Sequence, residues 1–205
     1  MIFQTLIVAF TISYVGSIPP GAINISVMQL SILKKHRAAI FFAVAASSIE
    51  FIYAGVTVRL HLFLNTYSAI SNYFKIVTSV VLIALGLWNI LSAKTPFATG
   101  VNTKLTGRHG FLRGLILGIV NPMTIPFWLA ITTYLENDRL IDLSVLGFWI
   151  YLTGLAVGTF CLLLTVNALG KRFTKISDNK LLVYKVPGIL LIGLGTYFLL
   201  KLILL

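Results

Sequence analysis

Six apolar stretches, each near the length that crosses a lipid bilayer, dominate this sequence. They cover about residues 3–32, 38–58, 74–92, 111–134, 143–168 and 183–204. A membrane-spanning helix needs roughly 20 apolar residues. Of all 205 residues, 58% are hydrophobic and 10% are charged, which is more apolar surface than a soluble domain of this size can bury. We therefore predict an all-α polytopic membrane protein with six transmembrane helices.

Basic residues gather in alternate connections between these stretches. The first, third and fifth connections, with their edges, hold twelve of the 16 Lys and Arg residues. The other four lie on the opposite side, together with Glu136, Asp138 and Asp142. Connections rich in Lys and Arg remain in the cytoplasm. The asymmetry predicts a multi-pass plasma-membrane protein with both termini outside the cytoplasm.

Two other interpretations of these charges are disfavoured. A net charge of +11 would favour nucleic acid in a soluble protein, but here we expect the lipid bilayer and no nucleic acid as partner. No Lys or Arg precedes Lys34, so the first stretch lacks the basic region of a signal peptide. We expect this stretch to remain as a helix.

Proline interrupts two of the stretches. Pro19-Pro20, followed by Gly21, lies inside the first, and Asn121-Pro122 lies in the corresponding place of the second half. Proline lacks the backbone N–H and clashes with the preceding turn, so each site should break its helix. Within a bilayer, the freed backbone groups are tolerated only where protein or a water-filled cavity covers them. Paired interruptions of this kind point to the binding site of a secondary transporter.

The two halves of the chain also resemble each other. Residues 16–23 align with residues 118–125 at an offset of 102, with Gly, Pro and Ile in step. Residues 82–88 align with residues 191–197 at an offset of 109. Three helices per half would place the halves in opposite orientations across the membrane, which is an inverted repeat.

These patterns together predict one transmembrane domain over residues 1–205. Its first repeat covers about 1–92 and its second about 111–205, with a cytoplasmic loop at about 93–110. The first and fourth transmembrane helices are the broken ones.

Glu50 is the one acidic residue deep inside a predicted span. A charge at the bilayer centre costs at least about 2.5 kcal/mol, so such residues are rare and usually functional. Four small residues share its helical face: Ala43, Ala46, Ser47 and Ala54. That face can pack closely against another helix and turn Glu50 inward. Two interpretations stay open: Glu50 binds substrate or a proton, or it is a neutral acid that links helices.

The two interruptions each carry an asparagine. Asn24 lies one turn after the first interruption, and Asn121 lies at the second. An amide can bond freed backbone groups or a ligand, and both roles are open for each residue. The predicted substrate-binding residues are Pro19, Pro20, Gly21, Asn24, Glu50, Asn121 and Pro122.

The sequence carries no pattern for catalysis or for a bound cofactor. It has one cysteine, and His36, His61 and His109 are expected in connections, so no thiolate or imidazole metal site is predicted. No Gly-Lys-Ser/Thr phosphate loop is present, which disfavours use of ATP by this chain. We expect neither an enzyme nor a resident metal or cofactor.

The motifs resemble those of the lysine-exporter family of the LysE/RhtB type. The resemblance is carried by Gly-Ser-Ile-Pro-Pro-Gly-Ala-Ile-Asn at residues 16–24, a basic turn, the intramembrane acid Glu50, and Phe111-Leu112-Arg113-Gly114 ahead of Asn121-Pro122. It extends over essentially the whole chain. That family typically has Pro-Gly-Pro in its first helix and often Asp as the acid, so the order Pro-Pro-Gly and Glu50 indicate a divergent member.

The resemblance implies a secondary exporter of amino acids or related small zwitterionic solutes. The alternatives are an exporter of a cation or another small solute, and a non-transporting membrane protein for assembly or electron transfer. Coupling to a proton or another ion, and a homo-oligomer, are compatible with the sequence. We expect the helix that restarts at Gly21 to hold a substrate carboxylate by its N–H groups, with Glu50 facing the ammonium group.

Overall fold

The computed structural model describes residues 1–18, 21–66, 68–91, 106–121, 124–170 and 185–204. Within these ranges the chain is helical and forms no strand. The helices are α1 (Ile2–Gly16), α2 (Ala22–Ile32), α3 (His36–Thr66), α4 (Ser68–Leu91), α5 (Gly107–Ile119), α6 (Thr124–Asn137), α7 (Val145–Ala168) and α9 (Val186–Leu204). The all-α prediction is confirmed.

Each predicted apolar stretch corresponds to one helix or to one pair of helices. The pairs are α1–α2 and α5–α6, and they separate where the two proline interruptions were predicted. Two described segments, His36–Leu64 and Val145–Ala168, are long and apolar enough to cross a membrane alone. The α5–α6 pair, bent by 65°, is a third if it forms one span. Six spans therefore stay a prediction.

The second apolar stretch is longer than predicted, and the three histidines expected in connections lie in helices. Arg59 and His61 were expected in a connection, but α3 continues to Thr66 and contains both. His36 begins α3, and His109 lies in the first turn of α5, which starts inside the expected loop at 93–110. The error arose because a charged residue was taken to end the span, although Arg59 lies over the ring of Phe148, 5.1 Å from its centroid.

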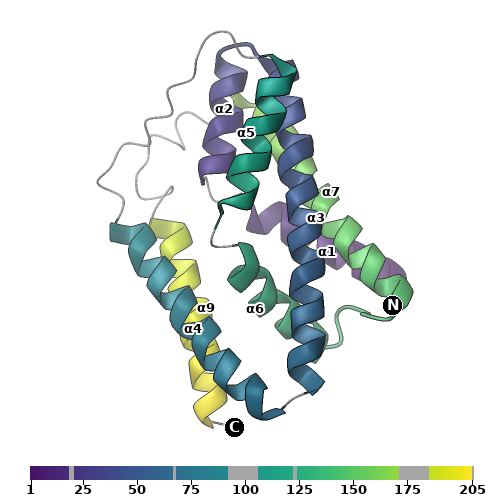
Figure 1. Cartoon of the computed structure of the whole chain (residues 1–205), viewed down its shortest axis with the longest axis vertical. Coiled ribbons are helices and arrows are strands. Elements are labelled where there is room, and N and C mark those ends of the chain that lie inside the picture. The colour runs from purple at the N-terminus through teal and green to yellow at the C-terminus, as the bar shows by residue number, and fades with distance from the viewer. Residues whose placement is uncertain (19–20, 67, 92–105, 122–123, 171–184, 205) are drawn as a thin grey trace.

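The helices pack in a pattern that matches the two halves of the chain. In Figure 1, α3 and α7 run through the body of the molecule, with α5 and α6 beside α3 and with α1 behind. The first part of each broken pair packs on the second helix of the opposite half: α1 on α7, and α5 on α3. The second parts do the same, α2 on α7 and α6 on α3.

The antiparallel pair α4 and α9 forms a separate layer at one side (Figure 1). A Cβ atom at Gly86 would lie 2.7 Å from Ile192 Cγ1, and one at Gly195 would lie 2.8 Å from Ile83 Cγ1. At the sequence offset of 109, Gly86 corresponds to Gly195, and Ile83 corresponds to Ile192. The two contacts therefore correspond to each other when α4 and α9 are exchanged.

Glycines and other small residues bring the helices of the main body together. A Cβ at Gly158 of α7 would lie 2.5 Å from Phe10 O on α1, and one at Gly110 of α5 would collide with Ala38 O on α3. Ala38 and Phe42 of α3 are buried at this crossing. Small residues allow such close approach between helices in lipid.

Large apolar side chains are also exposed on every described helix, among them Phe3, Ile52, Leu112, Trp149 and Ile189. Water would penalise so much exposed apolar surface, whereas a lipid environment would not.

Candidate functional site

The first interruption separates α1 from α2 between residues 17 and 21. The amide nitrogen Nδ2 of Asn24 donates to the carbonyl oxygen of Ser17 at 2.6 Å, so this buried side chain bonds a carbonyl that the end of α1 leaves free. Gly21 is the residue before α2, has φ −97° and ψ −172°, and has no atom within 4 Å of where a Cβ would lie. Pro19 and Pro20 lie outside the described residues.

The second interruption separates α5 from α6 between residues 120 and 123. The hydroxyl of Tyr53 on α3 donates to the carbonyl oxygen of Ile119 at 2.7 Å. Asn121 is half-buried, and its backbone N–H donates to Gly118 O at 3.4 Å. Pro122 lies outside the described residues. As at the first interruption, a side chain bonds a carbonyl at the end of the preceding helix.

Glu50 points from α3 toward α6. The indole Nε1–H of Trp128 donates a hydrogen bond to Glu50 Oε1. The small residues on the Glu50 face, including Ala43, Ala46 and Ala54, are buried in helix contacts. The prediction that this face packs and turns Glu50 inward is therefore confirmed.

The Phe127–Trp128 pair on α6 connects Glu50 with the first interruption. A Cβ at Gly16, the last residue of α1, would lie 3.4 Å from Phe127 Cζ. The rings of Phe127 and Trp128 meet edge to face, with centroids 5.0 Å apart. On the other side, a Cβ at Gly118 would lie 3.0 Å from Ile49 Cβ, one residue before Glu50. The end of α1 thus lies against Phe127, and the end of α5 lies against the turn of α3 that carries Glu50.

Glu50 keeps unused hydrogen-bonding capacity in this arrangement. No Lys, Arg or His in the described part of the chain forms an ion pair with it. A carboxylate has about four acceptor positions, and the indole of Trp128 occupies one of them. The site can therefore accept further donors such as an ammonium group. Among the described residues, no three His, Cys, Asp or Glu side chains group as metal ligands.

Trp128 and Tyr53 were not predicted from the sequence, since neither is near its partner in the chain.

A second feature that was not predicted is a row of polar residues along α3. His61 is buried, with Nδ1 3.0 Å from Thr133 Oγ1 and Nε2 2.7 Å from Glu136 Oε2. Thr57, one turn earlier, is buried and its hydroxyl finds no partner within the described ranges. Glu50 and Thr57 are seven residues apart, and Thr57 and His61 are four apart, so the three share one face of the helix. This spacing alone could have predicted the row of polar residues.

Comparison with protein families identifies the chain as a whole. The LysE type translocator family matches residues 14–202, which include both interruptions, Glu50 and Trp128. Comparisons with curated proteins and with solved structures give no significant match. Members of this family move small solutes across membranes. The match covers nearly the entire sequence, so the chain belongs to the LysE type translocator family of membrane transport proteins.

Proposed function

We propose that this protein is a secondary transporter that exports amino acids or related small zwitterions across the plasma membrane. The observation that carries the proposal is that the end of α1 lies against Phe127, next to the Trp128 that bonds Glu50, and that the end of α5 lies against the turn of α3 that carries Glu50. Helix ends and one acid near the middle of an apolar fold are the parts from which transporters build a substrate site.

The packing supports an inverted repeat of three plus three helices. The α1–α7 and α5–α3 contacts are equivalent under exchange of the two halves, and so are α2–α7 and α6–α3. The Gly86 and Gly195 contacts follow the same exchange. Two helices related in this way, with a site where they meet, allow the halves to rock and open the site to each side in turn.

The site favours a zwitterion over a bare cation. The first N–H groups of α2, starting at Ala22, have no acceptor within their own helix and carry partial positive charge, which suits a substrate carboxylate. Glu50 suits the substrate's ammonium group. The carbonyl oxygens of Ser17 and Ile119, the kind of ligand that a hard cation prefers, each already accept a hydrogen bond, from Asn24 and Tyr53 respectively. Asn121 and Pro122 would then close the site from the second half.

Counterflow in proteoliposomes tests the proposal directly. Vesicles loaded with one unlabelled solute take up its labelled form only if the protein carries that solute. We expect uptake with at least one amino acid and none with divalent cations. Counterflow of a divalent cation alone would favour the alternative of cation export, and no counterflow of any solute would favour a non-transporting role.

Gly21→Val is expected to weaken substrate binding without unfolding the protein. The backbone at Gly21 is compatible with valine, and a Cβ there meets nothing within 4 Å, so the change adds bulk only at the start of α2, where we place the carboxylate. We expect a rise in the half-saturation concentration of about tenfold. Gly193→Val is the matched control, because a Cβ at Gly193 also meets no atom within 4 Å.

Gly147, near the start of α7, is unsuitable as that control. A Cβ at Gly147 would collide with the carbonyl oxygen of Asp142, so substitution there would disturb folding. Equal saturation curves for Gly21→Val and Gly193→Val would remove the start of α2 from the site.

Both termini are expected outside the cytoplasm. On a Cys161→Ser background, Asn137→Cys, in the last turn of α6, should react with an impermeant thiol reagent added to whole cells. Lys34→Cys, in the turn between α2 and α3, should react only after the cells are opened. Both positions are exposed in the structure, so accessibility within the fold does not differ between them. The reverse labelling pattern would invert the proposed orientation.

A further inference from the structure

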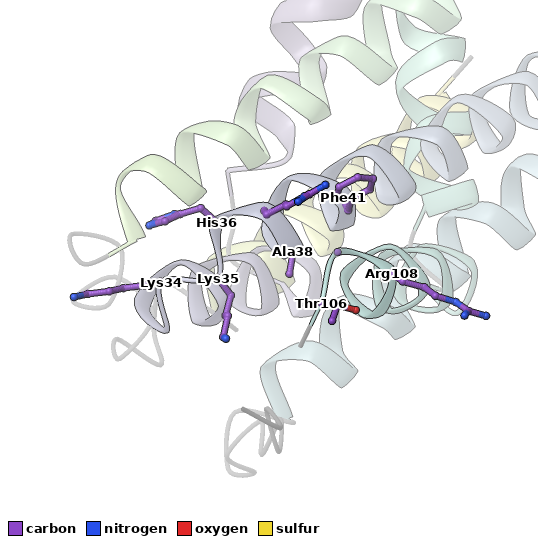
Figure 2. Close-up of a pocket in the computed structure, with 9 residues that line it drawn as sticks. Lys34, Lys35, His36, Ala38, Phe41, Thr106 and Arg108 are labelled. Carbon is purple, nitrogen blue, oxygen red and sulfur yellow. The ribbon is translucent and has the colours of Figure 1, made fainter. Parts of the chain in front are cut away.

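A basic hollow of about 550 Å³ lies at one end of the helix bundle, away from the Glu50 site. Its wall includes four cationic residues, Lys34, Lys35, Arg37 and Arg108. Figure 2 shows Lys34 and Lys35 on one side and Arg108 on the other, with Thr106 between them in this view. The transport site does not use these residues.

The backbone around the hollow is held in place from both sides. The turn after α2 is closed by the N–H groups of Lys34 and Lys35, which donate to Ser31 O at 2.9 Å and Leu30 O at 2.8 Å. Across the hollow, a Cβ at Gly107 would lie 2.9 Å from Phe41 Cδ2, so the start of α5 lies against α3. The hollow therefore lies where the two halves of the chain pack together, and backbone contacts hold its walls in place.

No described acidic residue compensates the positive charge in this region. None of the four cationic side chains forms an ion pair with any residue that the structure describes. Helices α3 and α5 both begin at the hollow, and the N-terminus of each adds partial positive charge. The four described acids, Glu50, Glu136, Asp138 and Asp142, line no part of it. These features suit an anion with more than one acceptor oxygen, such as a phosphate group.

The surroundings of the hollow indicate that this anion belongs to a lipid. Phe41 lines the hollow and is 41% exposed, and Ile40 and Val44 continue the exposed apolar surface along α3. Phe111 and Leu112 do the same along α5. A phosphate held by the basic residues would therefore have apolar surface beside it for acyl chains, which a free phosphate ion would not use.

We propose that this hollow binds the headgroup of an anionic phospholipid. The phosphate lies among Lys35, Arg37 and Arg108, whose long side chains turn toward it, and the acyl chains follow the exposed faces of α3 and α5. The lipid thereby links the α2–α3 turn of the first half to the start of the second half, on the side where the positive-inside rule places the cytoplasm and its anionic leaflet.

Lipid titration of the purified full-length protein, followed by native mass spectrometry, tests this proposal. Wild-type protein should retain phosphatidylglycerol in preference to phosphatidylcholine. The Arg37→Gln/Arg108→Gln variant should lose phosphatidylglycerol affinity by about 20- to 30-fold, since each basic residue near a membrane surface contributes about a factor of five. Arg139→Gln, an exposed basic residue elsewhere, should bind like wild type.

Two further arms distinguish the sources of the phosphate. Inorganic phosphate at millimolar concentration should not displace the lipid, because it lacks the acyl-chain contacts. Displacement by phosphate would show a site for free anions and overturn the lipid assignment. Equal lipid affinity of the double variant, with an unchanged thermal unfolding curve, would overturn the site itself.

Discussion

Glu50→Gln is expected to reduce transport by roughly 10- to 100-fold while the protein remains folded and inserted. Glutamine has nearly the same size, and its carbonyl oxygen can still accept the hydrogen bond from Trp128 Nε1. What it loses is the negative charge. A hydrogen bond between charged partners contributes about 1.5 to 3 kcal/mol, which corresponds to the expected loss when the substrate's ammonium group meets a neutral amide.

The measurement is initial-rate counterflow in proteoliposomes at several pH values, with reconstitution efficiency determined in parallel. Asp138→Asn removes one negative charge from an exposed acid and is the matched control, with transport expected at the wild-type rate. Glu50→Asp keeps the charge and should retain more activity than Glu50→Gln. A wild-type rate and an unchanged pH profile in Glu50→Gln would reduce Glu50 to a neutral residue that links α3 to α6.

Gly110→Val is expected to have the largest effect on stability, about 3 kcal/mol or more. Overpacking usually costs about 1 to 3 kcal/mol because side chains shift to make room. At Gly110 the obstacle is backbone: a Cβ would collide with Ala38 O and lie 2.8 Å from Ala38 C. Relief would require α3 and α5 to separate along the glycine contacts that continue at Gly114 and Gly118.

Unfolding of the detergent-solubilised protein by heat or denaturant measures this loss. Gly193→Val again serves as the control, since it makes the same change at a helical position where a Cβ meets no atom within 4 Å. Gly110→Val should also lower the yield of folded protein. If the two variants unfolded alike, the close crossing of α3 and α5 would be wrong.

Much of the architecture was readable from the sequence because it depends on local chemistry. Long apolar runs formed helices. The helices are interrupted where proline is expected to break its own turn, so α1 ends at Gly16, α2 begins at Ala22, α5 ends at Ile119 and α6 begins at Thr124. The exception was the end of α3, where Arg59 and His61 continue the helix because partners on other helices compensate their polarity.

The site was predicted only in part, for a physical reason that its residues illustrate. Glu50 was recognisable alone, since a lone acid in an apolar helix is costly wherever the chain folds. Its donor, Trp128, is 78 residues away in the chain, and Tyr53 and Ile119 are 66 apart. Nothing in the local sequence distinguishes these aromatic residues from others that face lipid.

The sequence by itself determined the helices, their interruptions, the uneven basic charge and the family, because apolar length, proline and charge act locally or by simple counting. Only the tertiary structure decided that Asn24 bonds Ser17 O, that Trp128 reaches Glu50, and that Gly110 lies against Ala38. Those outcomes depend on how helices cross, and a crossing is set by the summed fit of many small contacts between distant segments.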